Sequence, residues 1–216
     1  MARKTKEQAL VTKKQIIDAA IARFSEFGVS ATSLADIASA AGVTRGAIYW
    51  HFKNKTDLLN EILAQSESGL ENLEQEYRLK YPADPLSVLR AMLIYVLKAT
   101  ACDPHRRSLS EIIFHKCEFV GEMKTLQLMQ QNLYLECYEK IEDVLHECVA
   151  AGQLPSGLIT RQAAIIIRAY MTGLMENWLF MPESFNLAQE APQLVSTLIE
   201  TLQHSSVLSQ SALEFS

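Results

Sequence analysis

The sequence predicts an all-α fold, made of a small three-helix head at the N-terminus and a larger helical body. Apolar residues recur at spacings of three and four along most of the 216 residues, which is typical of amphipathic helices. Only eight residues are glycine, and no segment alternates apolar and polar residues as a half-buried strand would. The hydrophobic content of 49% is enough for a sizeable core. The scarcity of glycine also disfavours nucleotide-binding enzyme folds, whose phosphate loops are rich in it.

The first predicted helix covers residues 7–27. Its apolar residues fall on one face, and Gly28 is the kind of residue that commonly ends a helix. We expect this helix to support the two short helices that follow it. The apolar face comprises Ile17, Ala20, Ile21, Phe24 and Phe27.

Residues 32–52, TSLADIASAAGVTRGAIYWHF, carry the signals of two short helices joined by a tight turn. Ser33 and Asp36 are spaced as a capping box, in which each side chain accepts a hydrogen bond from a main-chain N–H at the helix start. Gly42 can adopt the left-handed conformation that ends the first helix, and Thr44 can cap the second. This arrangement predicts a helix-turn-helix, a motif whose second helix lies in the major groove of DNA.

The outward face of the second short helix has the chemistry of a DNA-reading surface. Arg45 can donate two parallel hydrogen bonds to guanine, and Gly46 has no side chain that would keep the helix away from the bases. Thr44 and Tyr49 carry hydroxyls for phosphate contacts, and Trp50 lies on the same side. The alternative is a helical corner with a solvated arginine and half-buried aromatic rings, which short motifs of this kind also produce.

The charge is divided between two parts of the chain. The net charge is −5, yet residues 1–60 contain nine Lys and Arg against five Asp and Glu, a balance of +4 that leaves −9 for the rest. A basic head on an acidic body fits DNA binding by one end of the molecule, because phosphate contacts supply affinity by releasing counterions. The basic tail with Arg3, Lys4 and Lys6 is by itself also compatible with a solvated surface.

A long helix of about 25 residues is expected after Asn54, which is placed to cap it. The main-chain N–H groups at its start can bind phosphate, and the helix continues as far as Tyr81. Further helices are expected over residues 85–102, 104–117 and 123–150.

The segment 163–181 is apolar nearly all round, which in a soluble protein indicates burial on more than one side. Arg168 and Glu176 interrupt it, so its apolar pieces are shorter than the roughly 20 residues needed to cross a bilayer. Together with residues 190–202 it predicts a four-helix interface between two copies of the chain. The expected interface residues are Ile166, Tyr170, Gly173, Asn177, Leu194 and Leu198.

The two ends of the chain and the four cysteines each support a separate expectation. The N-terminus is basic, but no apolar run of signal-peptide length follows it, so we expect a cytoplasmic protein. The serine-rich end, residues 205–216, is expected to be disordered. The cysteines show no CxxC pair and no paired-histidine spacing, which predicts buried free thiols, no metal site and no cofactor. They are Cys102, Cys117, Cys137 and Cys148.

The longer string TSLADIASAAGVTRGAIYWHFKNKTDLL, residues 32–59, resembles the DNA-binding signature of the TetR family of repressors. Its core, GVTRGAIYWHF, is similar to the AcrR-like branch of that family, which controls multidrug efflux pumps. The resemblance is strongest over residues 5–62. It extends into the body through EIIFHKCEFVGEM at 111–123 and GLMENWLF at 173–180.

The resemblance implies an all-α homodimer. Its heads, residues 1–53, would bind a near-palindromic DNA operator, and its bodies, residues 54–204, would carry the dimer interface and a small-molecule site. The ligand would shift the separation of the heads and so release the repressor from efflux-pump genes. Small lipophilic, cationic compounds are the implied ligands. The DNA-facing residues carried over from the family are Thr32, Ser33, Thr44, Arg45, Gly46, Tyr49, Trp50, His51 and Lys55.

The ligand site is expected in the body. Glu67 lies between Leu63 and Leu70 on the apolar stripe of the long helix, where an unpaired carboxylate is costly. It could be the counter-charge for a cationic ligand, or it could pair with Arg106 or Arg107. The residues expected around the ligand are Leu63, Glu67, Leu70, Arg106, Phe114, Gln130, Leu133 and Cys137.

Three alternatives remain at this stage. The protein could regulate another operon in response to a different ligand. A DNA-architectural protein would not need so large an apolar body. An enzyme would need a reactive cluster, for which His115, Cys117 and Glu118 are the nearest candidates. However, helical residues two positions apart point to different sides, so His115 and Cys117 do not form an obvious dyad.

Overall fold

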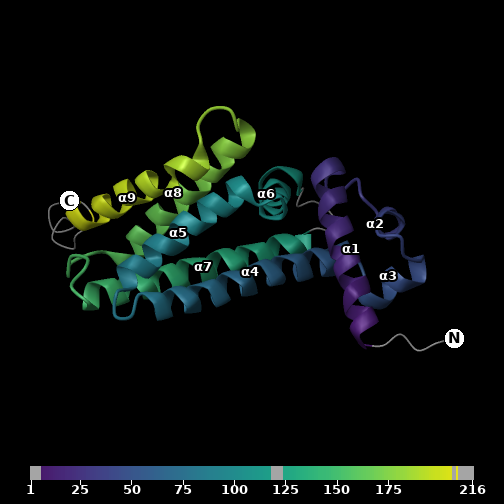
Figure 1. Cartoon of the computed structure of the whole chain (residues 1–216), viewed down its shortest axis with the longest axis horizontal. Coiled ribbons are helices and arrows are strands. Elements are labelled where there is room, and N and C mark those ends of the chain that lie inside the picture. The colour runs from purple at the N-terminus through teal and green to yellow at the C-terminus, as the bar shows by residue number, and fades with distance from the viewer. Residues whose placement is uncertain (1–5, 118–123, 206–207, 209–216) are drawn as a thin grey trace. The chain divides into compact units, whose positions relative to one another are not determined.

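The computed structural model describes residues 6–117, 124–205 and 208, and the elements formed by these residues are helices, as the sequence predicts (Figure 1). The long helix after Asn54 and the helix that begins at Pro85 lie where we expect them. The bounds are α1 Lys6–Phe27, α2 Leu34–Ala40, α3 Arg45–His51, α4 Lys55–Lys80, α5 Pro85–Cys102, α6 Pro104–Glu111, the π-helix η1 Ile112–Lys116, α7 Lys124–Ala150, α8 Thr160–Phe180 and α9 Leu187–His204.

The chain forms two compact units, which we call the head unit and the body unit. Of the described residues, the head unit contains 6–68, 105–117 and 124–129, and the body unit contains 69–104, 130–205 and 208. The sequence predicts a boundary after residue 53 instead. The difference arises because the first turns of α4, together with α6 and η1, pack into the head.

The head unit has one hydrophobic core that all of its early helices share. Figure 1 shows α2 and α3 beside α1, and each of the three contributes fully buried side chains. Phe24 of α1, Ile37 of α2 and Ile48 of α3 are 0% exposed. Leu58 of α4 and Ile112 of η1 are buried in the same core. Separating α4 or η1 from the head would expose these side chains to water, which is unfavourable.

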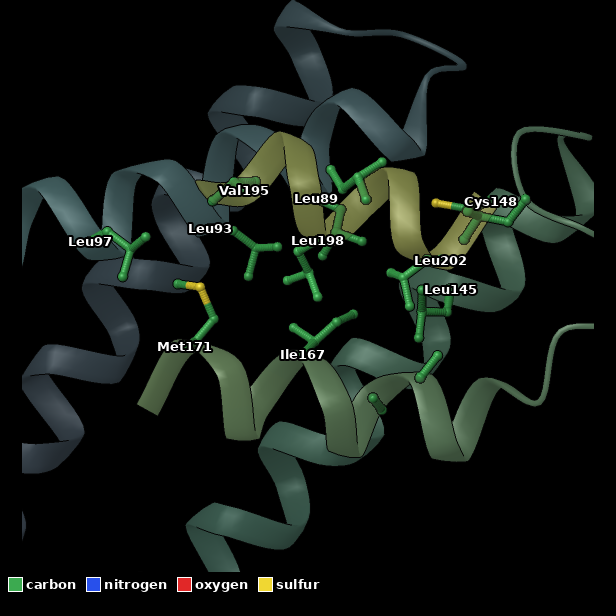
Figure 2. Close-up of a cluster of buried hydrophobic side chains, with 14 of the residues drawn as sticks. Leu89, Leu93, Leu97, Leu145, Cys148, Ile167, Met171, Val195, Leu198 and Leu202 are labelled. Atoms are coloured by element: carbon green, nitrogen blue, oxygen red, sulfur yellow. The ribbon is translucent and has the colours of Figure 1, made fainter. Parts of the chain in front are cut away.

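The body unit has a second core, built by α5, α7, α8 and α9. In Figure 2, Leu93 of α5, Ile167 of α8 and Leu198 of α9 point toward one another, with Leu145 of α7 close by. Leu198 is 4% exposed within the single chain, so its assignment to a dimer interface is wrong. The physical reason is that α9 turns its apolar face toward α5 and α8 of its own chain.

Two local predictions differ from the structure. The helix expected over residues 104–117 is α-helical only to Glu111 and continues as the π-helix η1. Leu208 lies in the segment expected to be disordered, yet it is buried in the body core, where its apolar side chain is removed from water. Its carbonyl oxygen accepts a hydrogen bond from the N–H of Ile159 at 2.9 Å. Residues 206–207 and 209–216 lie outside the described part of the chain.

The four cysteines are free thiols, but they differ in exposure. Cys102 is exposed, which contradicts the expectation that all four are buried; it is the last residue of α5, beyond the helix's buried side chains. Cys148 is buried, and this burial raises the pKa of its thiol to about 12. Burial also raises the pKa of the Cys117 thiol. Both thiols are therefore protonated, and unreactive as nucleophiles, near neutral pH.

One helix in the described residues, α5, is long and apolar enough to cross a membrane, judged by length and composition alone. The core helix of a soluble protein has the same composition. Leu89, Leu93 and Leu97 of α5 are buried in the body core, which accounts for its apolar sequence.

Candidate nucleic-acid interface

The capping box predicted at the start of α2 is present. The Ser33 hydroxyl accepts a hydrogen bond from the N–H of Asp36 at 3.1 Å, and the Asp36 carboxylate accepts one from the N–H of Ser33 at 2.9 Å. The Ser33 hydroxyl also donates to that carboxylate at 2.6 Å. These hydrogen bonds lower the pKa of Asp36, because they stabilise its charged form. The box holds the first turn of α2 in place.

A tight turn joins α2 to α3. Gly42 adopts a φ of +66°, the left-handed conformation that glycine reaches without steric strain. The N–H of Val43 then donates to the carbonyl of Ala38 at 2.9 Å, which closes the turn. The Thr44 hydroxyl caps α3 by accepting from the N–H of Ala47 at 3.2 Å. These contacts, together with the burial of Ile48, determine which face of α3 points outward.

The outward face of α3 presents the residues that the sequence predicts there. Thr44, Arg45 and Gly46 are exposed at its start, and Tyr49 and Trp50 are exposed one turn later. This face combines a guanidinium, which can bind base edges, with hydroxyls, which can bind phosphates, and with aromatic rings.

Trp50 is the most conspicuous side chain of this face. It is 73% exposed, although a tryptophan side chain in a soluble protein is usually largely buried. Its ring meets the His51 ring edge-on, with the ring centroids 4.5 Å apart. His51 is half-buried, so it supports Trp50 more than it extends the exposed face. Tyr49 beside it is 54% exposed, and neighbouring aromatic rings left in water are typical of an interaction surface.

Thr32 lies inside the head, contrary to the expectation that it faces DNA. It is 2% exposed, and its hydroxyl donates to the carbonyl of Gly28 at 2.8 Å. The chain turns sharply after α1, so this carbonyl has no partner within the helix and takes the hydroxyl instead. Ser33, by contrast, is exposed at the start of α2.

Two lysines of the head are already engaged by the protein. The Lys55 ammonium donates to the carbonyls of Val29 and Ser30 at 2.8 and 3.1 Å. Lys13 of α1 forms an ion pair with Glu61 of α4, with 2.7 Å between Nζ and Oε1. The hydrogen bond from Lys13 lowers the pKa of the Glu61 carboxyl. Both lysines therefore join α4 to the rest of the head.

An open cleft of about 860 Å³ lies in the head unit. It is lined by residues 30–34, by Tyr49 of α3, by residues 53–57 and by Asn60. Lys53 and Thr56 belong to this lining but not to the predicted DNA-facing set. The only signal in the sequence that could have identified Lys53 and Thr56 as DNA-facing residues is that they follow the helix-turn-helix motif closely. The lining residues include the hydroxyl-bearing Ser30, Ser33, Tyr49 and Thr56 and the lysines Lys53 and Lys55, side chains that can bind phosphate oxygens.

The residues expected around a ligand are divided between the two units. Leu63, Glu67, Arg106 and Phe114 are half-buried in the head unit. Glu67 and Arg106 each interact with other groups of the protein; one such contact joins the guanidinium of Arg106 to the Ser66 hydroxyl at 3.3 Å. In the body unit Leu70 and Leu133 are half-buried, Cys137 accepts a hydrogen bond from Arg168 at 3.4 Å, and the Gln130 side chain lies outside the described part.

The residues expected at a dimer interface lie on α8 and α9. Ile166, Tyr170, Gly173 and Leu194 are half-buried and Asn177 is exposed, whereas Leu198 belongs to the body core. The Tyr170 hydroxyl donates to the Leu194 carbonyl at 3.2 Å, so these two residues join α8 to α9 within one chain. Three large apolar side chains on or directly after α8 are more exposed than the apolar members of the predicted set: Ile165 at 45%, Phe180 at 82% and Met181 at 56%.

Known proteins match both the head and the body. Residues 16–62 match the bacterial regulatory proteins of the tetR family, and residues 84–204 match the C-terminal region of MAATS-type transcriptional repressors. The HTH-type transcriptional regulator AcrR of Shigella flexneri is 58% identical over 200 residues, which cover 93% of this chain and 93% of that protein.

Solved structures agree with these sequence matches. NalD, the secondary repressor of the MexAB-OprM multidrug efflux pump in Pseudomonas aeruginosa, matches with a TM-score of 0.80 and 32% identity, covering 93% of this chain and all of that one. A SmeT–triclosan complex matches with a TM-score of 0.80 and 28% identity, covering 91% and 94% of the two chains. SmeT is the repressor of the Stenotrophomonas maltophilia pump SmeDEF.

These relatives are transcriptional regulators, not enzymes, and the match to them runs through the helix-turn-helix and the helical body alike. The chain therefore belongs to the TetR family of bacterial transcriptional regulators.

Proposed function

We propose that this protein represses multidrug efflux genes by binding a near-palindromic operator as a homodimer in the cytoplasm. A small lipophilic, cationic compound bound within the region of residues 54–204 would release it from DNA. The observation that carries the proposal is the similarity over more than 90% of the chain to NalD and SmeT, both repressors of multidrug efflux pumps.

The head supplies the DNA-binding part of this proposal. In it, α3 enters the major groove with Arg45 toward the bases, while the hydroxyls of Thr44 and Tyr49 meet the phosphates. The cleft beside α3 takes the adjoining DNA backbone, with Lys53 and the start of α4 as its phosphate contacts. The balance of +4 over residues 1–60 supports the same orientation.

The dimer part of the proposal places α8 and α9 at the interface. Ile165, Phe180 and Met181 are large apolar side chains that one chain leaves in water. A second copy of the chain would cover them, and a two-fold dimer would match a near-palindromic operator. Asn177 and the half-buried Gly173 lie on the same helix and remain assigned to this contact.

The ligand part of the proposal concerns α4, which carries Glu67. The side chain is half-buried and already interacts with another group of the protein, so a cationic ligand would have to replace that partner. Because α4 also packs into the head core through Leu58 and Ile62, a ligand that displaces α4 would shift the head and favour the state that cannot bind operator.

The experiment that tests the proposed function is a ligand-screened operator-binding assay. Sedimentation of the protein with its operator should give two protein chains per operator. In the binding assay, lipophilic cations should lower the fraction of operator bound by the protein, and the compounds that bind the protein more tightly should lower it more. A monomer that binds a near-palindromic operator with one-chain stoichiometry would contradict the dimer. Operator binding that no lipophilic compound reduces would contradict the efflux assignment.

A substitution at Glu67 tests the role of its charge. Glu67→Gln keeps the shape and removes the charge, so binding of a cationic dye should weaken at least about tenfold, since one partner of a charge pair is lost. Binding of a neutral compound and operator affinity without ligand should stay close to those of the wild type. Isothermal titration calorimetry with one cationic and one neutral compound measures both effects.

The matched control is Glu76→Gln, which removes an exposed carboxylate from the same helix. It should change neither titration. Equal losses for the cationic and the neutral compound in Glu67→Gln, or no loss for either, would remove Glu67 from the counter-charge role.

A further inference from the structure

The turn between α1 and α2, residues 28–30, is held by other parts of the head unit on several sides. Gly28 ends α1 with a φ of +83°, and its carbonyl accepts from the Thr32 hydroxyl at 2.8 Å. The N–H of Val29 donates to the carbonyl of Lys116, the last residue of η1, at 3.1 Å. The carbonyls of Val29 and Ser30 both accept from the ammonium of Lys55. Almost every polar main-chain group of this turn is therefore bonded outside it.

Lys55 suits this position chemically. Main-chain carbonyls just beyond the C-terminal end of a helix carry partial negative charge, and a cation beside them is stabilised. Val29 is buried, and a carbonyl removed from water without a donor is costly, so its hydrogen bond to the Lys55 ammonium stabilises the folded head. Ser30 is exposed, so the second hydrogen bond contributes less. Lys55 is the first residue of α4. Its side chain therefore joins α4 to the α1–α2 turn, whose Val29 and Ser30 lie 26 and 25 residues before it in the chain.

The position of this turn determines where α2 begins. Ser33, the cap of α2, follows the turn by three residues, and α2 packs on α3. A loosened turn would therefore let the α2–α3 pair shift relative to α4, and a binding surface displaced by about 1 Å loses much of its function.

We propose that Lys55 is a positioning residue for operator binding: its ammonium holds the α1–α2 turn against α4, and it does not neutralise a DNA phosphate. This inference rests on the proposed DNA-binding function and assigns Lys55 a different role from the one that the family resemblance implies. Lys53 and Lys55 both line the cleft beside α3, but Lys53 is exposed, whereas Lys55 is half-buried and its ammonium is bonded to two main-chain carbonyls. We therefore assign the phosphate contact of this segment to Lys53.

The salt dependence of operator binding separates the two roles. Each neutralised phosphate contributes about 0.9 to the slope of log K against log salt. Lys55→Met keeps the length of the side chain and removes the ammonium. It should weaken operator binding by about tenfold, because the α2–α3 pair is no longer held in position, and leave the salt slope unchanged. Lys53→Met should lower the slope by about 0.9 and weaken binding to every sequence.

Two further measurements exclude a merely structural effect. Titration at protein concentrations far above Kd gives the fraction of active protein, so that Kd refers to the folded molecules alone. Hydrogen exchange of the DNA-free protein should show faster exchange of the main-chain amides over residues 28–36 in Lys55→Met and no change in Lys53→Met. If Lys55→Met does not fold, Lys55→Gln is the smaller change, and the same results are expected of it.

A salt slope that falls by about 0.9 in Lys55→Met would make Lys55 a phosphate contact and overturn the inference. Unchanged Kd, or unchanged exchange over residues 28–36, would overturn it as well. In each of these cases the wild-type protein still binds its operator, so the proposed function stands. A wild-type protein that binds no operator is the separate result that would remove the proposed function.

Discussion

Replacing Phe24 by alanine should lower the free energy of unfolding of the head by about 3–5 kcal/mol, the usual cost of removing a buried aromatic ring. Phe24 is 0% exposed and lies in the core that α1 shares with α2, α3 and the start of α4. The cavity left behind would loosen the support of α3 as well as that of α1. Urea denaturation followed by circular dichroism measures the loss, and the fraction of protein able to bind operator should fall with it.

Phe27→Ala is the matched control for this substitution. Phe27 lies one turn later on α1 and is 47% exposed, with the guanidinium of Arg23 over its ring at 4.1 Å. Its replacement should cost no more than about 1 kcal/mol, because only a partly exposed ring and one cation–π contact are lost. Equal losses for Phe24→Ala and Phe27→Ala would show that the head core is not organised around α1 as described.

Arg45→Ala should weaken operator binding by roughly 1–3 kcal/mol and reduce the preference for operator over scrambled DNA. Arg45 is exposed at the start of α3, where a guanidinium can donate two hydrogen bonds to one guanine. Binding curves on operator and scrambled DNA at one fixed salt concentration measure both quantities. The fixed salt matters because phosphate contacts make every such affinity depend on it.

Tyr49→Phe is the comparison for Arg45→Ala. It removes only a hydroxyl from the same exposed face, and a phosphate-bound hydroxyl should weaken binding to both DNA sequences alike. The two substitutions should therefore differ in specificity as well as in affinity. If Arg45→Ala bound operator and scrambled DNA as tightly as the wild type, α3 would not be the recognition helix.

Local signals in the sequence were sufficient to place α2, α3 and their caps. The Ser33–Asp36 capping box, the left-handed Gly42 and the Thr44 cap all occur where the sequence predicts them. Each depends on residues within one or two turns of one another, so the chemistry that forms it is visible in a short window of sequence. The outward face of α3 follows from the same information, because Ile48 marks the inner side of so short a helix.

The positions of Thr32, Lys55 and Leu198 depended on the tertiary structure. Thr32 and Lys55 carry donors that could serve DNA or the main chain, and the fold directs them to the turn after α1. Leu198 lies on an apolar face that could cover a partner or its own core, and the packing of α5 and α8 against α9 decides for the core. The sequence by itself determined that these side chains are polar donors or apolar surface. Which group each one meets was decided by contacts between residues far apart in the chain, and no local pattern records those contacts.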